Sequence, residues 1–426
     1  FLAGGEHAQA GGGPQQVGGQ AADGARHLSG RLSGGDTVAI GLADPVEVLV
    51  AALAADLAGA TPLLCDPGWD PARRRLVLGT VPAASWLAEP LPTAWVNEPP
   101  PAARSAPDDL AWACFSSGST GRPRAVVRTR ASWTDSFPHV DALTGIGAAD
   151  VVLVPGPLVS SLYGFAAVHA LAAGATVLVP GRWAPDLLRH ASVVHLVPHR
   201  LADLLDLLDT ASALRTAVVG GAALNLALRA RAAAEGIRVV SYYGATELSF
   251  VAADADGTGL RAFPGVEIQV RDGEIWARSP WIAHGYLGGA DGPLRADADG
   301  FASVGDLAEP YEPGGVLRVR GRGDGAIQTG GATVVPEDVE DVLKTVPGVG
   351  DVVVVGTPHP FLGSVVTAVV EGEVTRAELE AVARGGLDPA QRPRRWYAVA
   401  SLPRTPSGKP ARAAVASSVP GLRRLA

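Results

Sequence analysis

Lysine is rare in this chain, and its distribution draws attention to one position. Only two of the 35 basic residues are lysines, and one of them, Lys409, follows Pro-Ser-Gly near the C-terminal end. A lysine ammonium is a compact charge on a flexible stem, whereas an arginine guanidinium is a planar fork. Because arginine serves almost everywhere else, we interpret Lys409 as a cation that must reach a tight anionic site. The alternative is an ordinary solvated lysine on a surface loop.

A second candidate is a run of hydroxyl residues and glycines that follows the apolar residues 110–115 directly. The run consists of Ser116, Ser117, Gly118, Ser119, Thr120 and Gly121, and it leads into Arg-Pro-Arg. Backbone N–H groups and hydroxyls of such a loop can converge on phosphate oxygens. The spacing of glycine and lysine that defines a Walker A loop is absent from it. A flexible Ser/Gly linker is the alternative interpretation.

A third candidate combines an aromatic ring, a hydroxyl and a carboxylate behind the strand-like residues 237–241. Tyr243, Thr246 and Glu247 lie around a Gly-Ala turn there. Open parallel sheets bind ligands at the carboxyl ends of their strands. The ring could pack on a base, the hydroxyl could contact a phosphate, and the carboxylate could hold Mg²⁺. A local capping pair formed by the threonine and the glutamate is the alternative.

A fourth group of residues follows in the C-terminal third. Asp306, which comes after a glycine, could accept hydrogen bonds from ribose hydroxyls, or it could be a turn aspartate. The residues that share its surroundings are polar or glycine: Arg322, Asp324, Gly330 and Gly331.

The elements that position these residues follow a βα rhythm. Continuous apolar runs at residues 37–42, 61–64, 151–154, 176–179, 193–197 and 217–219 predict buried strands, and residues 46–57 and 201–208 predict helices. Runs of this kind that alternate with helices are typical of parallel sheets covered on both faces. The Pro/Ala-rich residues 98–107 predict a loop between two such units.

The pattern changes from about residue 257. Residues 266–270 and 274–277 alternate apolar with polar side chains, as half-exposed antiparallel strands do. Another boundary is expected near residues 321–325. Beyond it we predict helices at 336–344 and 376–383 and strands at 351–355 and 365–370. The fold class is therefore α/β, with parallel sheets, a small antiparallel β subdomain and a small α+β C-terminal domain.

Composition excludes several classes of partner. The net charge is −8, and basic residues do not cluster with aromatic ones, so nucleic acid and anionic membranes are poor partners. Cys65 and Cys114 lie far apart and lack metal-type spacing, which favours a reducing cytoplasm over a disulfide framework.

No membrane or secretory segment is expected. Residues 1–20 contain neither a basic n-region nor a continuous apolar h-region. The most apolar stretch, residues 46–64, is interrupted by Glu47 and Asp56, so it predicts a core helix and strand rather than a membrane span. We expect a cytoplasmic protein without integral membrane association.

Taken in this order, the four groups resemble the motifs of the adenylate-forming superfamily, which includes acyl-CoA synthetases, peptide-synthetase adenylation domains and beetle luciferases. The similarity runs from about residue 35 to residue 412. It implies an N-terminal adenylation core at residues 1–322, with its β-rich subdomain at about 257–320. It also implies a mobile C-terminal domain at residues 323–426 that carries the catalytic lysine.

The resemblance implies a role for each candidate residue. The loop from Ser116 to Gly121 would wrap the β- and γ-phosphates of ATP, and Lys409 would bridge the carboxylate of the acid and the α-phosphate. Thr246 would contact the α-phosphate and Glu247 would hold Mg²⁺. Adenine would be flanked by Gly220, Gly221, Ala222 and Tyr243, and the ribose hydroxyls would bind to Asp306 and Arg322. Asp324 would be the hinge, and Gly330 and Gly331 would line the approach of the thiol.

Two departures from the family pattern concern the phosphate loop and the acyl pocket. Arg124 stands where the loop usually has lysine, and Ser160 stands where many acyl-CoA synthetases have histidine. Peptide-synthetase domains place an aspartate within the segment that corresponds to residues 157–165, and this chain has none there. We therefore expect the substrate to be a carboxylic acid without an α-amino group, either an aryl acid or a short to medium acyl acid. One candidate is o-succinylbenzoate.

The function that the resemblance implies is an AMP-forming acid–thiol ligase that uses ATP, Mg²⁺ and coenzyme A. Two alternatives stay open at this point. The acyl group could pass to the phosphopantetheine arm of an acyl carrier protein, or the chain could be a catalytically silent nucleotide-binding scaffold.

Overall fold

The structure is a computed structural model. It describes residues 11–29, 31–69, 71–79, 81, 83, 85–92, 106–116, 124–208, 212–290, 292–322, 325, 327–329, 332–359, 362–406 and 408–425. The predicted residues Ser117, Gly118, Ser119, Thr120, Gly121, Asp324, Gly330 and Gly331 lie outside these ranges, as does most of the predicted loop at 98–107.

Two compact units make up the chain. Unit 1 comprises Phe1–Ile268 and Ala277–Ala302, and unit 2 comprises Gln269–Trp276 and Ser303–Ala426. The mobile C-terminal domain at residues 323–426 stays a prediction.

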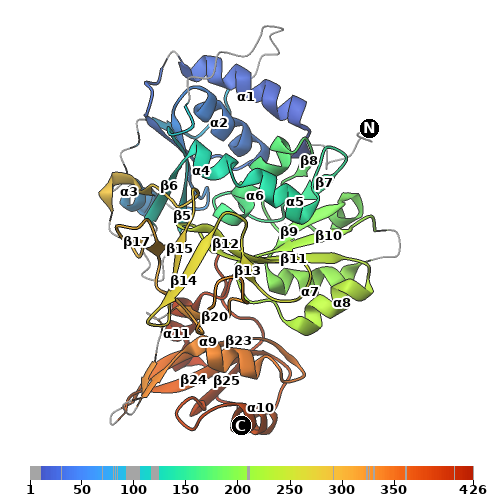
Figure 1. Ribbon diagram of the computed structural model, residues 1–426, viewed down its shortest axis with the longest axis vertical. Coiled ribbons are helices and arrows are strands. Elements are labelled where there is room, and N and C mark those ends of the chain that lie inside the picture. The colour runs from blue at the N-terminus through green and yellow to red at the C-terminus, as the bar shows by residue number, and fades with distance from the viewer. Residues whose placement is uncertain are drawn as a thin grey trace. The chain divides into compact units, whose positions relative to one another are not determined.

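The larger sheet of unit 1 has its central strands in parallel (Figure 1). Among the described residues its strands follow the order β1-β8-β7-β9-β10-β11-β12-β13. Their bounds are β1 (Gly11–Gly12), β7 (Val151–Leu153), β8 (Thr176–Leu178), β9 (Val193–Leu196), β10 (Thr216–Val219), β11 (Arg238–Ala245), β12 (Ser249–Asp254) and β13 (Arg261–Ala262). The parallel part of the sheet ends at β11, because β12 runs antiparallel to β11.

Helices cover both faces of this sheet, which is why its strands are apolar on both sides. In Figure 1, α7 and α8 lie on one face and α5 and α6 on the other. Leu201, Leu204 and Ala232 of α7 and α8 pack with Val194 and Leu196 of β9 in one buried cluster. The helices are α5 (Phe137–Thr144), α6 (Ser161–Ala172), the 3₁₀ helix η1 (Pro185–His190), α7 (Pro198–Leu207) and α8 (Leu226–Ala234).

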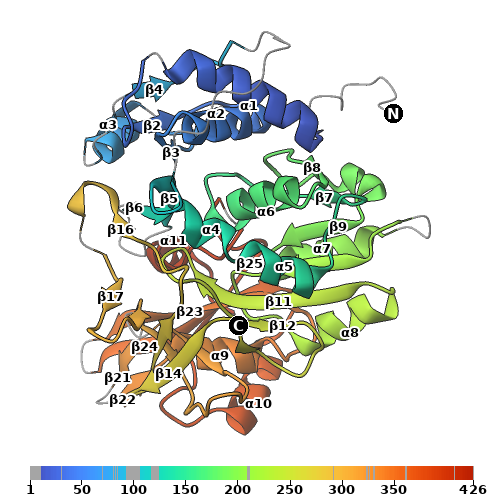
Figure 2. The same cartoon turned by 45° about the horizontal axis from the view of Figure 1, so that its top comes forward.

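The other sheet of unit 1 has the described strand order β16-β6-β5-β3-β2-β4. Its strands are β2 (Thr37–Ile40), β3 (Thr61–Leu64), β4 (Ser85–Leu87), β5 (Leu110–Ser116), β6 (Arg124–Thr129) and β16 (Gly285–Tyr286). The helices nearby in sequence are α1 (Pro14–Ser29), α2 (Pro45–Leu57), α3 (Pro71–Leu78) and α4 (Arg130–Thr134), all visible in Figure 2. Helix α2 begins where Asp44 accepts from the backbone N–H of Val46 at 2.8 Å, with Pro45 in the first turn.

Unit 2 contains an α+β fold around a five-stranded sheet. The described strands are β21 (Ile327–Thr329), β22 (Ala332–Val334), β23 (Val349–His359), β24 (Gly363–Gly372) and β25 (Arg395–Val399). Alternate residues of β23 face different helices, because strand side chains have a period of two. Val352 and Val354 pack with residues of α9 (Pro336–Leu343) and α10 (Arg376–Gly386). Val353 packs with residues of α11 (Arg412–Ser418) and of the 3₁₀ helix η4 (Val419–Gly421).

Short antiparallel strands occupy residues 267–322. They are β14 (Glu267–Arg271), β15 (Glu274–Arg278), β17 (Arg295–Ala296), β18 (Ala302–Ser303), β19 (Asp306–Ala308) and β20 (Val319–Arg322), with the 3₁₀ helix η2 (Leu287–Gly289). The predicted α/β class, with parallel sheets, antiparallel strands after 257 and an α+β C-terminal part, is confirmed. In the described part of the chain no helix has the length and apolarity that a bilayer crossing requires.

Candidate active site

The turn that carries Thr246 and Glu247 joins the last parallel strand, β11, to the antiparallel strand β12. Its shape depends on Gly244, where a Cβ atom would come to 2.0 Å from the main-chain oxygen of Ser249. Ser249 has a φ of 59°, a left-handed conformation that non-glycine residues adopt at tight turns. The sequence therefore folds back abruptly at this point, and the two candidate side chains lie at the strand end.

Glu247 is a buried carboxylate with 4% of its surface exposed. Its Oε1 accepts a hydrogen bond from the hydroxyl of Tyr286 at 3.1 Å, and its main-chain oxygen accepts from the N–H of Ala283 at 2.8 Å. Burial first, and the charge of Glu247 second, raise the pKa of Tyr286, so the phenol stays a donor. The N–H of Leu294 donates to the same phenol oxygen at 3.2 Å.

Arg128, the next-to-last residue of β6, is the second buried charge of the site, with 3% of its surface exposed. Its Nη2 donates to the main-chain oxygen of Thr246 at 2.6 Å, and its Nη1 donates to the main-chain oxygen of Trp281. Burial lowers the pKa of Arg128 to about 10, and the neighbouring Cys114 and Glu247 partly oppose this fall. The guanidinium therefore stays cationic at neutral pH and faces the turn that carries Glu247.

The hydroxyl of Thr246 lies 2.9 Å from the hydroxyl of Ser161. Ser161 is the first residue of α6, and Ser160 precedes it as the N-cap. Two hydroxyls thus meet at a helix N-terminus, where backbone N–H groups and the helix dipole favour negative charge. The predicted Thr246 is in this way joined to Ser161, a residue of the segment 157–165 whose contact with Thr246 the sequence did not predict.

The residues proposed for adenine lie on neighbouring strands of the larger sheet. Gly220 and Gly221 follow β10, and Tyr243 belongs to β11, which runs parallel to β10. A Cβ at Gly220 would come to 2.3 Å from the ring of Tyr242, so only glycine fits there. Gly221 has a φ of 88°, which glycine adopts at no steric cost.

The two described residues that flank the predicted phosphate loop are side by side. Ser116 at the end of β5 is the antiparallel partner of Arg124 at the start of β6. The residues between them are outside the described ranges. The β5–β6 pairing fixes the two residues between which this predicted loop runs.

Unit 2 contains the other described candidates. Asp306 of β19 and Arg322 of β20 are Cα partners in an antiparallel pair. Lys409 lies in a turn in which the N–H of Thr405 donates to the main-chain oxygen of Lys409 at 2.7 Å. Gly408, with a φ of 87°, precedes it.

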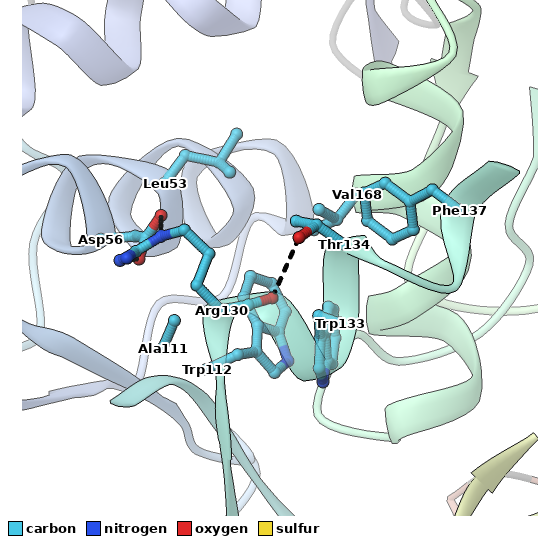
Figure 3. A pocket seen from close by; sticks show the side chains of 9 residues that line it. All are labelled: Leu53, Asp56, Ala111, Trp112, Arg130, Trp133, Thr134, Phe137 and Val168. Atoms are coloured by element: carbon cyan, nitrogen blue, oxygen red, sulfur yellow. Dashed lines mark hydrogen bonds and ion pairs between the residues drawn. The ribbon is translucent and has the colours of Figure 1, made fainter. Parts of the chain in front are cut away.

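A separate small pocket of about 50 Å³ lies in unit 1 (Figure 3). An ion pair between Arg130 and Asp56 closes one side of it. Its lining is mainly apolar and aromatic: Leu53, Asp56, Ala111, Trp112, Arg130, Trp133, Thr134, Phe137 and Val168. None of the predicted site residues lines it, so the pocket does not belong to the candidate site.

Within the described ranges, no group of three or more His, Cys, Asp or Glu side chains forms a metal cage. Mg²⁺ is commonly held by one or two carboxylates together with substrate phosphates. The lone carboxylate of Glu247 fits that mode of binding rather than a dedicated protein site.

Comparison with known proteins agrees with this organisation. Residues 79–287 match the family model of the AMP-binding enzyme, and residues 338–409 match that of the AMP-binding enzyme C-terminal domain. The uncharacterized acyl–CoA ligase YhfT of Bacillus subtilis is 31% identical over 328 residues, which cover 71% of this chain and 67% of that protein. The 2-succinylbenzoate–CoA ligase of Escherichia coli is 29% identical over 295 residues, which cover 68% and 65%.

A solved structure of E. coli MenE with bound OSB-AMS has the same fold, with a TM-score of 0.82 at 26% identity. It covers 95% of this chain and 92% of that one. The sequence alignments span about two thirds of the length of these curated relatives. The chain belongs to the family of AMP-binding enzymes, the adenylate-forming superfamily, and the two relatives named above are acyl–CoA ligases.

Proposed function

We propose that the protein is an ATP-dependent acid–thiol ligase. It activates a non-amino carboxylic acid as an acyl adenylate, releases pyrophosphate and transfers the acyl group to coenzyme A. The observation that carries the proposal is the β11–β12 turn, in which Thr246 and Glu247 are fixed by Ser161, Arg128 and Tyr286. The names of the relatives, acyl–CoA ligase and 2-succinylbenzoate–CoA ligase, support the same reaction class.

In this proposal the protein holds ATP along the strand ends. Thr246 donates to the α-phosphate, and the loop from Ser116 to Gly121 surrounds the β- and γ-phosphates. Gly220, Gly221, Ala222 and Tyr243 flank adenine, and Asp306 and Arg322 bind the ribose. Glu247 would hold Mg²⁺, and the bound cation would neutralise charge on the leaving pyrophosphate.

Adenylation is then a displacement at phosphorus. A carboxylate oxygen of the acid forms a bond to the α-phosphorus. The bond between the α-phosphorus and the oxygen that bridges it to the β-phosphate breaks, and its electron pair leaves with pyrophosphate. Catalysis of such a step is mostly positioning and electrostatic stabilisation. Lys409 supplies a positive charge between the carboxylate and the α-phosphate, and Arg128 fixes the turn from which Thr246 reaches that phosphate.

Thioester formation completes the reaction. The thiolate of coenzyme A attacks the acyl carbon, and AMP leaves with the oxygen that bridged carbon and phosphorus. Asp324 is proposed as the hinge about which the C-terminal domain turns between the two half-reactions. Gly330 and Gly331 are proposed to line the path along which the thiol approaches.

A screen of carboxylic acids tests this function. The protein is incubated with ATP, Mg²⁺, coenzyme A and one aryl, dicarboxylic or short to medium acyl acid at a time, and AMP and acyl-CoA are measured. We expect equal amounts of AMP and thioester with at least one non-amino acid. If AMP is released but no acyl-CoA forms, and a thioester forms only when a phosphopantetheinylated carrier protein is added, then the acceptor is the carrier protein and not coenzyme A. Absence of AMP with every acid, in a protein that binds ATP, would contradict the proposal.

A further inference from the structure

The turn that carries Lys409 is closed at its base by main-chain contacts. Arg404 and Pro410 form an isolated antiparallel bridge, and the N–H of Ala411 donates to the oxygen of Pro403 at 2.8 Å. Inside the turn, the N–H of Gly408 donates to the oxygen of Thr405 at 2.8 Å. These contacts shape the turn. They do not by themselves attach it to the rest of unit 2.

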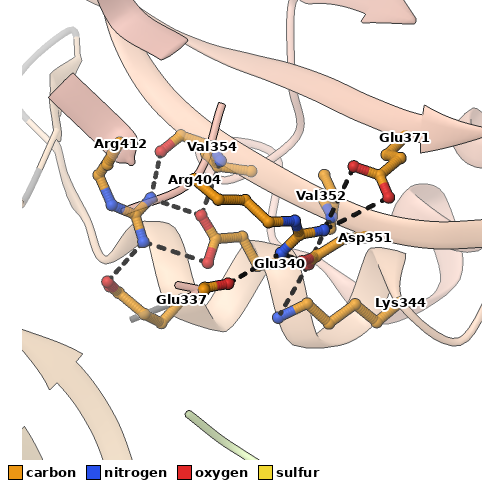
Figure 4. A network of polar contacts seen from close by, with 10 residues as sticks. Glu337, Glu340, Lys344, Asp351, Val352, Val354, Glu371, Arg404 and Arg412 are labelled. Carbon is orange, nitrogen blue, oxygen red and sulfur yellow. Dashed lines mark hydrogen bonds and ion pairs between the residues drawn. The ribbon is translucent and has the colours of Figure 1, made fainter. Parts of the chain in front are cut away.

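An arginine at the first end of the turn makes that attachment to the strands. Nη1 of Arg404 donates to Oδ2 of Asp351 at 3.0 Å, and Nη2 donates to Oε2 of Glu371 at 3.2 Å (Figure 4). Asp351 and Glu371 are register partners on β23 and β24. The oxygen Oε2 of Glu371 also accepts from the N–H of Leu402 at 2.6 Å, just before the turn.

A second arginine attaches the other end to helix α9. Nη2 of Arg412 donates to Oε1 of Glu337 at 2.7 Å and to Oε2 of Glu340 at 3.1 Å. Nη1 of Arg412 bonds to Oε1 of Glu340 and donates to the main-chain oxygen of Val354 at 2.5 Å. Figure 4 shows the guanidinium between these three partners.

The carboxylates of this second attachment are costly to bury. Glu340 is 5% exposed, and its Oε1 also accepts from the N–H of Val354 at 2.7 Å. Burial raises the pKa of Glu337, and Arg412 only partly opposes the rise. Buried ion pairs are a weak source of net stability, because desolvation offsets the attraction. A role in fixing geometry explains their presence better than a role in stability.

We propose that Arg404 and Arg412 are positioning residues that hold Lys409 in place. One guanidinium at each end of the turn binds it to β23, β24 and α9, so the lysine ammonium is delivered to a fixed point. This inference rests on the proposed function of Lys409 in adenylation. A displacement of about 1 Å at a reacting group can cost about 10²-fold in rate, so loss of one attachment must be visible in that step.

The chain offers a direct readout, because Lys344 and Lys409 are its only lysines. Limited labelling of the full chain with an amine-acylating reagent, followed by peptide mass spectrometry, gives a rate for each lysine. We expect Arg412→Gln to raise the labelling rate of Lys409 several-fold relative to Lys344. Lys344 cannot serve as the reference for Arg404→Gln, because Asp351, a partner of Arg404, also lies near Lys344. For that variant the labelling rate of Lys409 is compared with its rate in the denatured chain.

The same variants are assayed in the two half-reactions. We expect Arg412→Gln to lower the kcat of acid-dependent ATP–pyrophosphate exchange by about 10²-fold with little change in KM for ATP. Transfer from a supplied acyl adenylate to coenzyme A stays near the parent rate. Arg376→Gln, which removes an exposed pair with Glu380 in the same unit, is the matched control and changes neither readout.

Three results would overturn the inference. One is parent-like labelling and exchange in folded Arg412→Gln and Arg404→Gln, and another is an equal fall of both half-reactions. The third is a loss of exchange with unchanged labelling of Lys409, which would mean that the arginine acts on the substrate instead. If Arg412→Gln does not fold, the nearly isosteric Glu337→Gln replaces it with the same expected direction. A parent protein without exchange would refute the proposed function, while the labelling ratio would still decide the positioning role.

Discussion

The guanidinium of Arg128 donates to the main-chain oxygen of Thr246 at 2.6 Å, across 118 residues of sequence. This contact joins the C-terminal end of strand β6 to the turn that carries Glu247. It places a buried cation behind the turn, where both a proposed phosphate contact and a proposed metal ligand originate. The position of that turn therefore depends on a residue that need not touch the substrate itself.

Arg128→Gln is expected to lower the rate of adenylation by about 10²-fold, because the turn loses its buried anchor. The carbonyl oxygens of Thr246 and Trp281 lose a charged donor, which costs about 1–3 kcal/mol of unfolding free energy. Arg130 lies two residues after Arg128 and forms an ion pair with Asp56. Arg130→Gln removes that pair, serves as the control and should retain activity. Pyrophosphate exchange and thermal unfolding measure both effects. Equal activities in the two variants would show that Arg128 has no specific role in the site.

Lys409→Ala should reduce adenylate formation by about 10²–10³-fold, because the charge on the α-phosphate loses its counter-charge. Thioester formation from a supplied acyl adenylate should persist, since the lysine acts in the first step only. Lys409→Arg should restore little activity, because a planar fork does not reproduce a point charge. Arg376→Gln, which removes an exposed ion pair with Glu380, is the control and should behave as the parent. A parallel loss of both half-reactions in folded Lys409→Ala would refute the assigned role.

Glu247→Gln should raise the Mg²⁺ concentration needed for half-maximal rate and lower the maximal rate, because a hard anionic oxygen ligand is lost. The amide can still accept from the hydroxyl of Tyr286, so the fold of the turn is preserved. Glu267→Gln, which removes an exposed carboxylate paired with Arg278, is the control. A Mg²⁺ titration of pyrophosphate exchange decides the matter. An unchanged titration in folded Glu247→Gln would leave the carboxylate with a structural role only.

Stability should depend on pH through His195, a buried residue of β9. Burial lowers the pKa of His195 to about 3, and the neighbouring His169 adds to this effect. The unfolded chain takes up a proton near pH 6.5, while the folded chain resists it until about pH 3. The contribution of His195 to stability is therefore full above about pH 6.5, and it falls by up to about 1.4 kcal/mol per unit as the pH decreases below that value.

His195→Leu should accordingly flatten the pH dependence of the unfolding free energy in denaturant titrations between about pH 6.5 and 4. Val218→Ala, at the register partner of His195 on β10, should lower the unfolding free energy without changing that slope. The same slope in His195→Leu and in the parent would show that other groups cause the acid sensitivity.

Much of the fold follows from local sequence. The apolar run at residues 61–64 and the helix after Asp44 are found where the pattern predicts them, because burial on both faces and capping are local signals. Helix α7 begins at Pro198, three residues before the predicted start at Leu201. Its first turn contains polar side chains, so the apolar periodicity does not reveal it.

The contacts around the site were less accessible. Arg128 is visible in the sequence as a charge that interrupts the apolar strand Arg124–Thr129. Its hydrogen-bond partners, Thr246 and Trp281, lie 118 and 153 residues away, so local sequence does not indicate them. Tyr286 and Ser161 carry no motif of their own and join the site only through tertiary contacts with Glu247 and Thr246. Sequence patterns report period and propensity, and they do not report which distant side chains meet.

The transfer of a carboxylate oxygen tests the central claim most directly. The protein is supplied with ATP, Mg²⁺, coenzyme A and an accepted acid whose carboxylate carries heavy oxygen in both positions, and the products are weighed by mass spectrometry. If the carboxylate attacks the α-phosphorus, each molecule of AMP gains one heavy oxygen and pyrophosphate gains none. Heavy oxygen in inorganic phosphate, with ADP in place of AMP, would mean attack at the γ-phosphate and would contradict adenylate formation by this protein.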